Sequence, residues 1–147
     1  MRISALTRTH ADVTVALWQA CGLTRPWNDP AHDFVRAVSG PSSTVLGAFE
    51  APDLVGTVMV GHDGHRGWMY YLAVGSEHRR RGIGRQLVAA AEQWVADRGL
   101  PKMMLMVRTA NPDLVSFYAS LGYHDQGAVV MGRFFDEAVN AERVAAH

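Results

Sequence analysis

The chain has 147 residues, of which 48% are hydrophobic and 19% charged, a composition typical of one globular domain and not of a disordered chain. The 14 Lys and Arg residues balance the 14 Asp and Glu residues, so no net charge favours a nucleic acid or an anionic membrane as a partner. Its single cysteine, Cys21, excludes an internal disulfide, and no segment is apolar over the length of a bilayer. We therefore expect a cytoplasmic protein with one domain, residues 1–135, and a C-terminal tail, residues 136–147.

The N-terminal part of the chain predicts a short strand and two helices. The strand covers residues 2–6, and the first helix runs from Thr9 or His10 to Gly22, because glycine favours the end of a helix. Its apolar positions, which have helical spacing, are Val13, Ala16, Leu17, Ala20 and Cys21. Asp29 and Pro30 are typical of an N-cap and a first helical position, so the second helix begins there.

Three strands are expected next, at residues 43–50, 54–62 and 68–74, joined by turns into an antiparallel meander. His62, Asp63 and His65 gather near the second turn. No further cluster of Cys, His or carboxylate residues with ligand spacing completes a metal site. We therefore expect polar residues at a hairpin tip and no metal.

The last of these strands runs into an arginine-rich loop that predicts an anion-binding site. Gly82 and Gly84 have no Cβ, so backbone N–H groups can approach a ligand closely. The helix that begins there adds unpaired N–H groups and the positive end of its dipole. Fixed positive charge is supplied by Arg79, Arg80, Arg81 and Arg85. A diphosphate fits such a loop, although its spacing differs from that of the dinucleotide and nucleoside triphosphate loops.

The rest of the chain predicts a helix, a strand, a second helix and a final hairpin. The buried face of the first helix comprises Ile83, Leu87, Val88, Ala91, Trp94 and Val95. A strand at residues 102–107 follows, and Asn111 is expected to cap a helix that ends at Gly122. Residues 123–125 and 128–134 should pair, and residues 135–147 are helical or frayed. The strand–helix–strand crossover predicts an α/β fold with a parallel pair at the centre of a mixed, mostly antiparallel sheet.

Two motifs far apart in the sequence resemble the signatures of the GNAT-type N-acetyltransferases. The first is Leu72-Ala73-Val74 followed by Arg79-x-x-Gly82-x-Gly84, and the second is Asn111-x-x-Leu114-x-x-Phe117-Tyr118-x-x-Leu121-Gly122-Tyr123. The order of elements is similar to the GNAT fold along almost the whole chain, which implies that the sheet is splayed at its parallel pair. Residues 25–30 and 61–67 further resemble the bacterial YpeA-like subgroup.

This resemblance implies an acetyltransferase with acetyl-CoA as donor, which moves an acetyl group to a primary amine by direct attack in a ternary complex. The acceptor is a small molecule, an amino acid, a peptide or a protein amine. The implied CoA-binding residues are Leu72, Ala73, Val74, Arg79, Arg80, Arg81, Gly82, Ile83, Gly84, Arg85, Asn111 and Tyr118. Backbone N–H groups at residues 72–74 would bind the thioester carbonyl. Tyr118 matches the general acid that protonates the leaving thiolate, and its alternative role is a core tyrosine beside Phe117.

The base that deprotonates the amine stays open in this sequence. Many relatives carry a glutamate in the central strands, whereas residues 68–71 and 103–106 contain no carboxylate. Water or one of the polar residues near the hairpin could accept the proton. The candidates are His62, His65, Asp63 and Tyr70.

For the acceptor we expect binding residues in the connection between the two N-terminal helices, with Tyr70 nearby. The ring of Trp27 beside the Asp29 carboxylate suits a cationic amine, whereas Arg25 suits an acceptor that carries a carboxylate. These two indications conflict, and both remain open.

Two other functions are compatible with the motifs. A non-catalytic acyl-CoA-binding module in regulation or assembly is favoured by the missing glutamate and disfavoured by Tyr118 and Asn111. A plain nucleotide-binding domain is the third possibility. A homodimer through the final strands or the tail is compatible with the sequence, and neither a nucleic acid nor a membrane is an expected partner.

Overall fold

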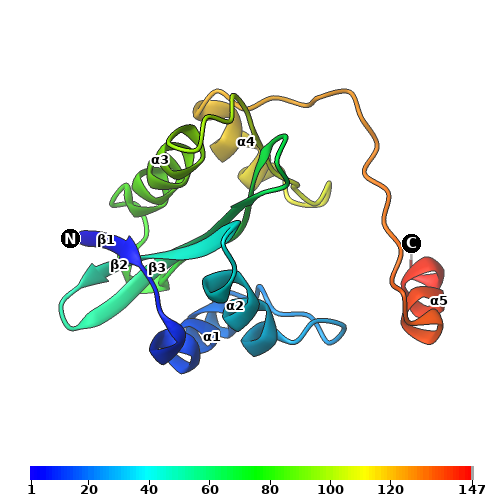
Figure 1. The fold of residues 1–147 in the computed structure, drawn as a ribbon, viewed down its shortest axis with the longest axis horizontal. Helices are drawn as coiled ribbons and strands as arrows, with labels where there is room; N and C mark the ends of the chain where they lie inside the picture. The colour runs from blue at the N-terminus through cyan, green and yellow to red at the C-terminus, as the bar shows by residue number, and fades with distance from the viewer. Residues whose placement is uncertain (147) are drawn as a thin grey trace. The chain divides into compact units, whose positions relative to one another are not determined.

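The computed structural model describes residues 1–146 and contains a five-stranded sheet with the order β1-β2-β3-β4-β5 (Figure 1). The strands are β1 (Arg2–Ala5), β2 (Ser43–Glu50), β3 (Asp53–His62), β4 (Gly67–Val74) and β5 (Met103–Met104). Neighbours from β1 to β4 pair antiparallel, and β5 pairs parallel with β4. This confirms the predicted mixed, mostly antiparallel sheet with a parallel pair.

Helices occupy the connections between the strands and the C-terminal part of the chain. They are α1 (Ala11–Ala20), α2 (Pro30–Ser39), α3 (Ile83–Ala96), α4 (Pro112–Ser120) and α5 (Glu137–Ala145), with short 3₁₀ turns at η1 (Arg8–His10) and η2 (Ser76–His78). The chain divides into two compact units, Met1–Met106 and Val107–His147. None of the described helices combines the length and the apolar character that a membrane crossing requires.

In the first unit, α1 and α2 pack on one face of the sheet and α3 packs on the other (Figure 1). The first face has a core built around Trp18 and Phe34, both fully buried. On the other face, Gly67 allows α3 to lie close to the sheet, since a Cβ at this position would be 2.5 Å from Cγ2 of Val95. Five of the six residues expected on the buried face of α3 are buried, namely Ile83, Leu87, Val88, Ala91 and Val95, and the sixth, Trp94, is partly buried.

The apolar face predicted for α1 is confirmed only in part: Leu17 and Cys21 pack against the core, whereas Ala16 and Ala20 are exposed. Its buried residues are Thr14 and Trp18, whereas Val13 is 46% exposed. The helix turns its largest side chain to the sheet, because burial of an indole removes more apolar area from water than burial of a valine. Leu17 and Cys21 are only partly buried at the edge of this core.

A bulge interrupts β4 in the middle of the strand. Thr57 lies opposite Ala73 and Met59 lies opposite Tyr70, so β4 has one residue more than β3 between these pairs. The extra length is taken up at Tyr71, whose φ is 51°, a left-handed value that is rare for a residue with a side chain. The surrounding structure must therefore hold this residue in place.

Three contacts hold Tyr71. Its ring stacks on Trp18, with ring centroids 3.8 Å apart and an interplanar angle of 11°. Its carbonyl accepts a hydrogen bond from the Thr57 hydroxyl (3.2 Å), and the oxygen of this hydroxyl in turn accepts from Nε1 of Trp18 (2.9 Å). Its hydroxyl donates to Oδ2 of Asp33 in α2 (2.9 Å). Side chains of α1, α2 and β3 thus fix the bulge.

Beyond the start of β4, the two parallel strands separate. Their pairing consists of Gly67 with Met103 and Trp68 with Met104. From residue 69 onward, the edge of β4 that faces away from β3 has no strand partner among the described residues. The sheet therefore opens at the position that the resemblance implies.

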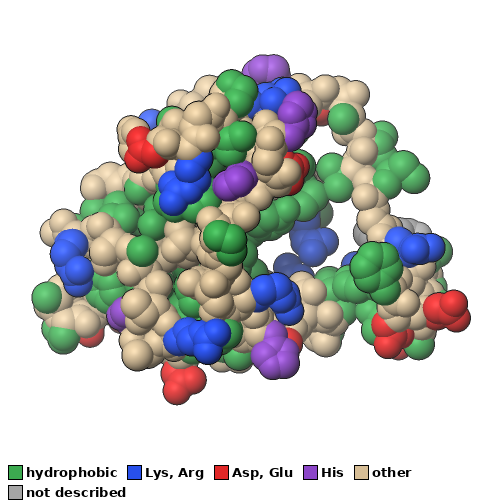
Figure 2. Space-filling view, viewed as in Figure 1, with side chains coloured by type: hydrophobic (Ala, Val, Ile, Leu, Met, Phe, Trp, Pro, Cys, Tyr) green, Lys and Arg blue, Asp and Glu red, His purple; other side chains and the backbone are tan. Residues whose placement is uncertain are grey.

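The final hairpin predicted for the second unit is wrong. Residues 124–136 contain no strand, and Val129 and Phe135 in this segment are 87% and 91% exposed. Figure 2 shows hydrophobic side chains at the surface of the molecule. Without the hairpin, β5 is the edge strand, and the parallel pair is not at the centre of the sheet. The alternating pattern of residues 123–134 indicates strand propensity, but a strand also requires the edge of a sheet with which to pair. The helical alternative for residues 135–147 is confirmed by α5, and residue 147 lies outside the described residues.

The contacts of the bulge predict that replacing either of two fully buried threonines, Thr57 and Thr14, has a different effect on stability. Thr57→Val leaves the indole N–H of Trp18 and the carbonyl of Tyr71 without their partner, so the free energy of unfolding should fall by about 1–3 kcal/mol. Thr14→Val is the matched control, because Oγ1 of Thr14 has no hydrogen-bond partner among the described residues, and stability should stay equal or rise. Urea unfolding of both variants checks this, and equal losses would contradict the role of Thr57.

Candidate active site

The loop between β4 and α3 has a backbone geometry that suits the binding of an anion. Gly82 is the N-cap of α3 with φ 77°, and a Cβ there would meet nothing within 4 Å. Arg80 also has a left-handed φ, 63°. Such residues turn successive backbone N–H groups toward one concave side. The first turn of α3 contains no acidic side chain, so its N–H groups and its positive dipole end stay available to an anion.

The arginines of the loop have different roles. Arg79 donates from Nε to the carbonyl of Val74 (3.1 Å), and its guanidinium lies 3.8 Å from Sγ of Cys21. Arg81 binds both carboxylate oxygens of Glu50, at the end of β2. These two side chains tie the loop to the sheet. The exposed guanidinium of Arg80 makes no hydrogen bond or ion pair with any described residue and is the one available to a ligand.

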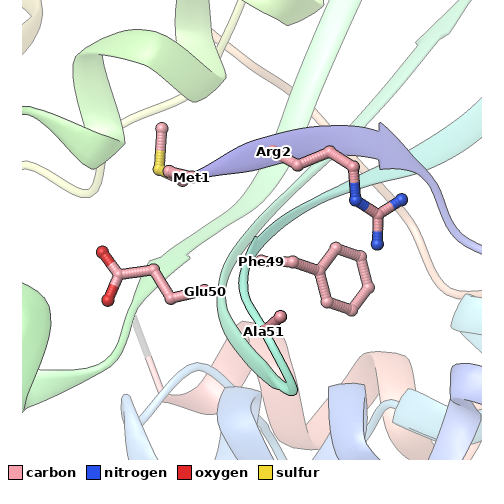
Figure 3. A pocket seen from close by; sticks show the side chains of 5 residues that line it. All are labelled: Met1, Arg2, Phe49, Glu50 and Ala51. Carbon is pink, nitrogen blue, oxygen red and sulfur yellow. The ribbon is translucent and has the colours of Figure 1, made fainter.

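The contact between Glu50 and Arg81 was not predicted from the sequence. Nδ1 of His78 also lies 3.6 Å from the Glu50 carboxylate, so Glu50 forms one cluster with two residues of the loop. Glu50 borders a shallow depression of about 370 Å³ in which the Arg2 guanidinium lies over the Phe49 ring, 4.8 Å from its centroid. Figure 3 shows the carboxylate of Glu50 directed away from that ring. The depression contains no nucleophile, and we assign it no chemistry.

The end of β4, just before the loop, can offer a ligand its backbone groups but not its side chains. Leu72 and Val74 are partly buried, and Ala73 is 3% exposed and belongs to the core. Ile83 is likewise buried, at 3% exposure, so only its backbone can reach a ligand. The bulge at Tyr71 precedes these residues directly and sets the direction of the strand toward the loop.

The two tyrosines of the bulge are held in their neutral form. Burial and the hydrogen bond to Asp33, whose charge adds to the effect, raise the pKa of Tyr71 to about 12, although Arg25 opposes this. Burial and the charge of Asp63 raise the pKa of Tyr70 above its usual value. Neither phenol ionises near neutral pH, which removes Tyr70 from the candidate bases.

Asp63 is also excluded as a base. Backbone N–H groups of Arg66 and His65 donate to its Oδ1, each at 2.8 Å, and lower its pKa to about 2. A carboxylate of such low proton affinity does not take a proton from an ammonium at neutral pH. His62 and His65 remain from the predicted set. Among the described residues, no group of three or more His, Cys, Asp or Glu residues could hold a metal ion.

The residues predicted for the acceptor have structural contacts of their own. Arg25 donates to the carbonyls of Gly22 (2.8 Å) and Thr24 (2.9 Å), after the C-terminus of α1. Asp29 caps α2 by accepting from the backbone N–H of His32 (3.1 Å). Trp27 is partly buried in the same connection. Their role in acceptor binding stays a prediction.

In the second unit, Tyr118 is 7% exposed and its ring contacts those of Phe117 and Tyr123. Burial raises the pKa of Tyr118 to about 12, so the phenol keeps its proton at neutral pH. No described group hydrogen-bonds to its hydroxyl. Asn111 caps α4, as predicted, by accepting from the backbone N–H of Leu114 (3.2 Å).

Comparison with known proteins agrees with this geometry. The model of the acetyltransferase (GNAT) family matches residues 6–123. An acetyltransferase of Sodalis glossinidius (strain morsitans) is 39% identical over 131 residues, which are 89% of this chain and 92% of that protein. An uncharacterized N-acetyltransferase of Yersinia pestis is 36% identical over 133 residues, which are 90% of this chain and 94% of that protein.

Solved structures at lower identity share the fold. The aminoglycoside N-acetyltransferase AAC(6')-Iy, in a complex with CoA, has a TM-score of 0.78 at 17% identity and covers 91% of this chain and 94% of that one. A ribosomal-protein-alanine N-acetyltransferase of Brucella melitensis has a TM-score of 0.73 at 19% identity, with 91% of this chain and 100% of that one covered. The family match over residues 6–123 and the relatives at 36–39% identity establish that the chain belongs to the GNAT family of acetyltransferases.

Proposed function

We propose that this chain is an acetyl-CoA-dependent N-acetyltransferase that acetylates a primary amine of a small molecule, an amino acid, a peptide or a protein. The observation that carries the proposal is the uncapped start of α3, where Gly82 opens the helix N-terminus to an anion. In the same unit, the edge of β4 has no strand partner beyond Trp68. Residues 25–30 and 61–67 support assignment to the YpeA-like subgroup, and the single cysteine supports a reducing cytosol.

The donor's diphosphate is assigned to the loop. Backbone N–H groups of Gly82, Ile83 and Gly84 point from the start of α3, and the guanidinium of Arg80 adds a mobile positive charge. Arg79 and Arg81 act on the loop's position, because their guanidinium groups are bound to Val74 and Glu50. Arg85, in the first turn of α3, and Asn111 complete the assigned set.

The thioester is assigned to the opened edge of β4. When bound, acetyl-CoA supplies an acetyl group activated as a thioester. Backbone N–H groups within residues 72–74 donate to its carbonyl oxygen, on which negative charge develops during attack. The bulge fixes the direction of these donors before the substrate arrives, so they need no reorganisation during the reaction.

In the proposed reaction, the neutral amine attacks the acetyl carbon, the new C–N bond forms, and the C–S bond breaks. The amine nitrogen gives up one proton to water, directly or through His62 or His65. Tyr118 gives one proton to the departing thiolate and recovers it from solvent. A pKa of about 12 keeps Tyr118 protonated and ready for this step at neutral pH.

The activity is tested by release of free thiol from acetyl-CoA in the presence of amines, peptides and protein N-termini. We expect release with at least one class of amine, and Tyr118→Phe should lower kcat by about 10²-fold or more with little change in the dissociation constant of acetyl-CoA. An unchanged kcat would remove Tyr118 as the proton donor. Binding of acetyl-CoA without release across the whole panel would instead support a non-catalytic acyl-CoA-binding module.

The loop is tested with two glycines of the same φ. Gly82 and Gly99, before and after α3, both have φ +77°, and a Cβ at either position meets nothing within 4 Å. Alanine at either position should lower the free energy of unfolding by roughly 1–2 kcal/mol, because both residues must adopt a left-handed conformation. Only Gly82→Ala should weaken acetyl-CoA binding, measured by calorimetry, by about tenfold or more. Equal affinities in the two variants would contradict the assignment of the diphosphate to this loop.

A further inference from the structure

Three side chains of the hairpin between β3 and β4 converge outside the loop that is assigned to the donor. Nε1 of Trp68 donates to Oδ2 of Asp63 (3.3 Å), and the Asp63 charge also acts on the phenol of Tyr70. The ring of Tyr70 is 43% exposed. An indole, a phenol and a carboxylate therefore meet at one accessible place.

The strand register shows which face of the sheet they occupy. Tyr70 lies directly opposite Met59, which packs against the core around Trp18 and Phe34. Residues directly opposite in an antiparallel pair share a face, and Trp68 lies on the same face because it is two residues from Tyr70. Both rings therefore point to the side of α1 and α2, away from α3.

The carboxylate of Asp63 is fixed by neutral donors. Backbone N–H groups and the Trp68 indole supply its hydrogen bonds, and the guanidinium of the neighbouring Arg66 donates to the carbonyl of His65. No described Lys, Arg or His side chain forms an ion pair with Asp63. A full negative charge near two aromatic rings is thus left for an external cation.

The position of these rings along β4 relates them to the reaction. Trp68 is the last residue of β4 that pairs with β5, and Leu72 begins the segment assigned to the thioester. With a strand rise of roughly 3.3 Å per residue, Tyr70 and Trp68 lie about 7 and 13 Å along β4 from Leu72. A group bound at Asp63 is therefore too far from the acetyl carbon to be the attacking nitrogen. Moreover, an ammonium that Asp63 stabilises has no lone pair for attack.

We infer that Asp63, Trp68 and Tyr70 bind a second, non-reacting cationic group of the acceptor, and that the acceptor is a diamine or another amine with a separate cation. This inference rests on the proposed function. Asp63 supplies the charge, and the two rings supply cation–π contact and exclude water from one side of the cation. These residues bind and position the acceptor and take no part in proton transfer.

The test compares linear α,ω-diamines of increasing length with n-alkylamines of matching length in the thiol-release assay. We expect the wild type to prefer the diamine by about tenfold or more in kcat/KM at the best length. Asp63→Asn keeps a side-chain oxygen that can accept from the backbone N–H groups of His65 and Arg66. It should nevertheless remove most of the preference for diamines by raising their KM. It should leave kcat, the shape of the pH profile and the rates with monoamines unchanged.

Three further variants separate local binding from general effects. Asp53→Asn, at the start of β3, removes an exposed charge from the other hairpin and should preserve the preference for diamines. Tyr70→Phe keeps the ring and should preserve most of it, whereas Tyr70→Leu should reduce it. A wild type that treats diamines and monoamines alike, or an equal loss in Asp63→Asn and Asp53→Asn, would overturn the inference.

Failure of the proposed function is distinguishable from failure of this inference. If no amine releases thiol, calorimetry of the best-binding diamine with the wild type and with Asp63→Asn still measures the cation site. Binding that is weakened about tenfold or more in Asp63→Asn supports the site in a protein of another activity. Equal binding, or none to either protein, overturns it.

Discussion

The left-handed backbone of Tyr71 is the constraint on which the first unit depends. A residue with a side chain adopts φ 51° only when its surroundings hold it there, and here the stacked ring of Trp18, the hydroxyl of Thr57 and the carboxylate of Asp33 do so. These partners come from α1, β3 and α2. The core on that face of the sheet and the irregular strand are therefore parts of one arrangement.

Two features of β4 interrupt its regular pairing. Its pairing with β5 stops after Trp68, and the bulge at Tyr71 shifts its register with β3. The strand then leads to a loop held by Arg79 and Arg81 and to the open start of α3 at Gly82. Charge is distributed accordingly: positive groups gather at the loop, and the uncompensated carboxylate of Asp63 lies at the opposite end of β4.

The sequence predicted the elements whose signals are local. The N-caps Asp29 and Asn111 and the buried face of α3 follow from short-range spacing and are confirmed. Features that depend on distant partners could not be predicted: Glu50 binds an arginine 31 residues away, and Trp18 bonds to a threonine 39 residues away. The predicted final hairpin failed for the same reason, because strand propensity in residues 123–134 does not supply an edge. The two motifs predicted the family, which the comparisons confirm, and a donor site, which stays a prediction. The acceptor residues proposed above could not be chosen without the register of β3 and β4.

The central claim is that backbone N–H groups of the opened β4 and of the α3 N-terminus bind the donor together. Titration of the ¹⁵N-labelled protein with acetyl-CoA, followed by amide chemical shifts, tests this most directly. We predict the largest shifts at residues 72–74 and 82–85, with small shifts in β1 and at the tip of the β3–β4 hairpin, which lies at the opposite end of β4 from the loop. Unchanged shifts at either of the first two segments under saturating acetyl-CoA, or the largest shifts elsewhere, would contradict the account.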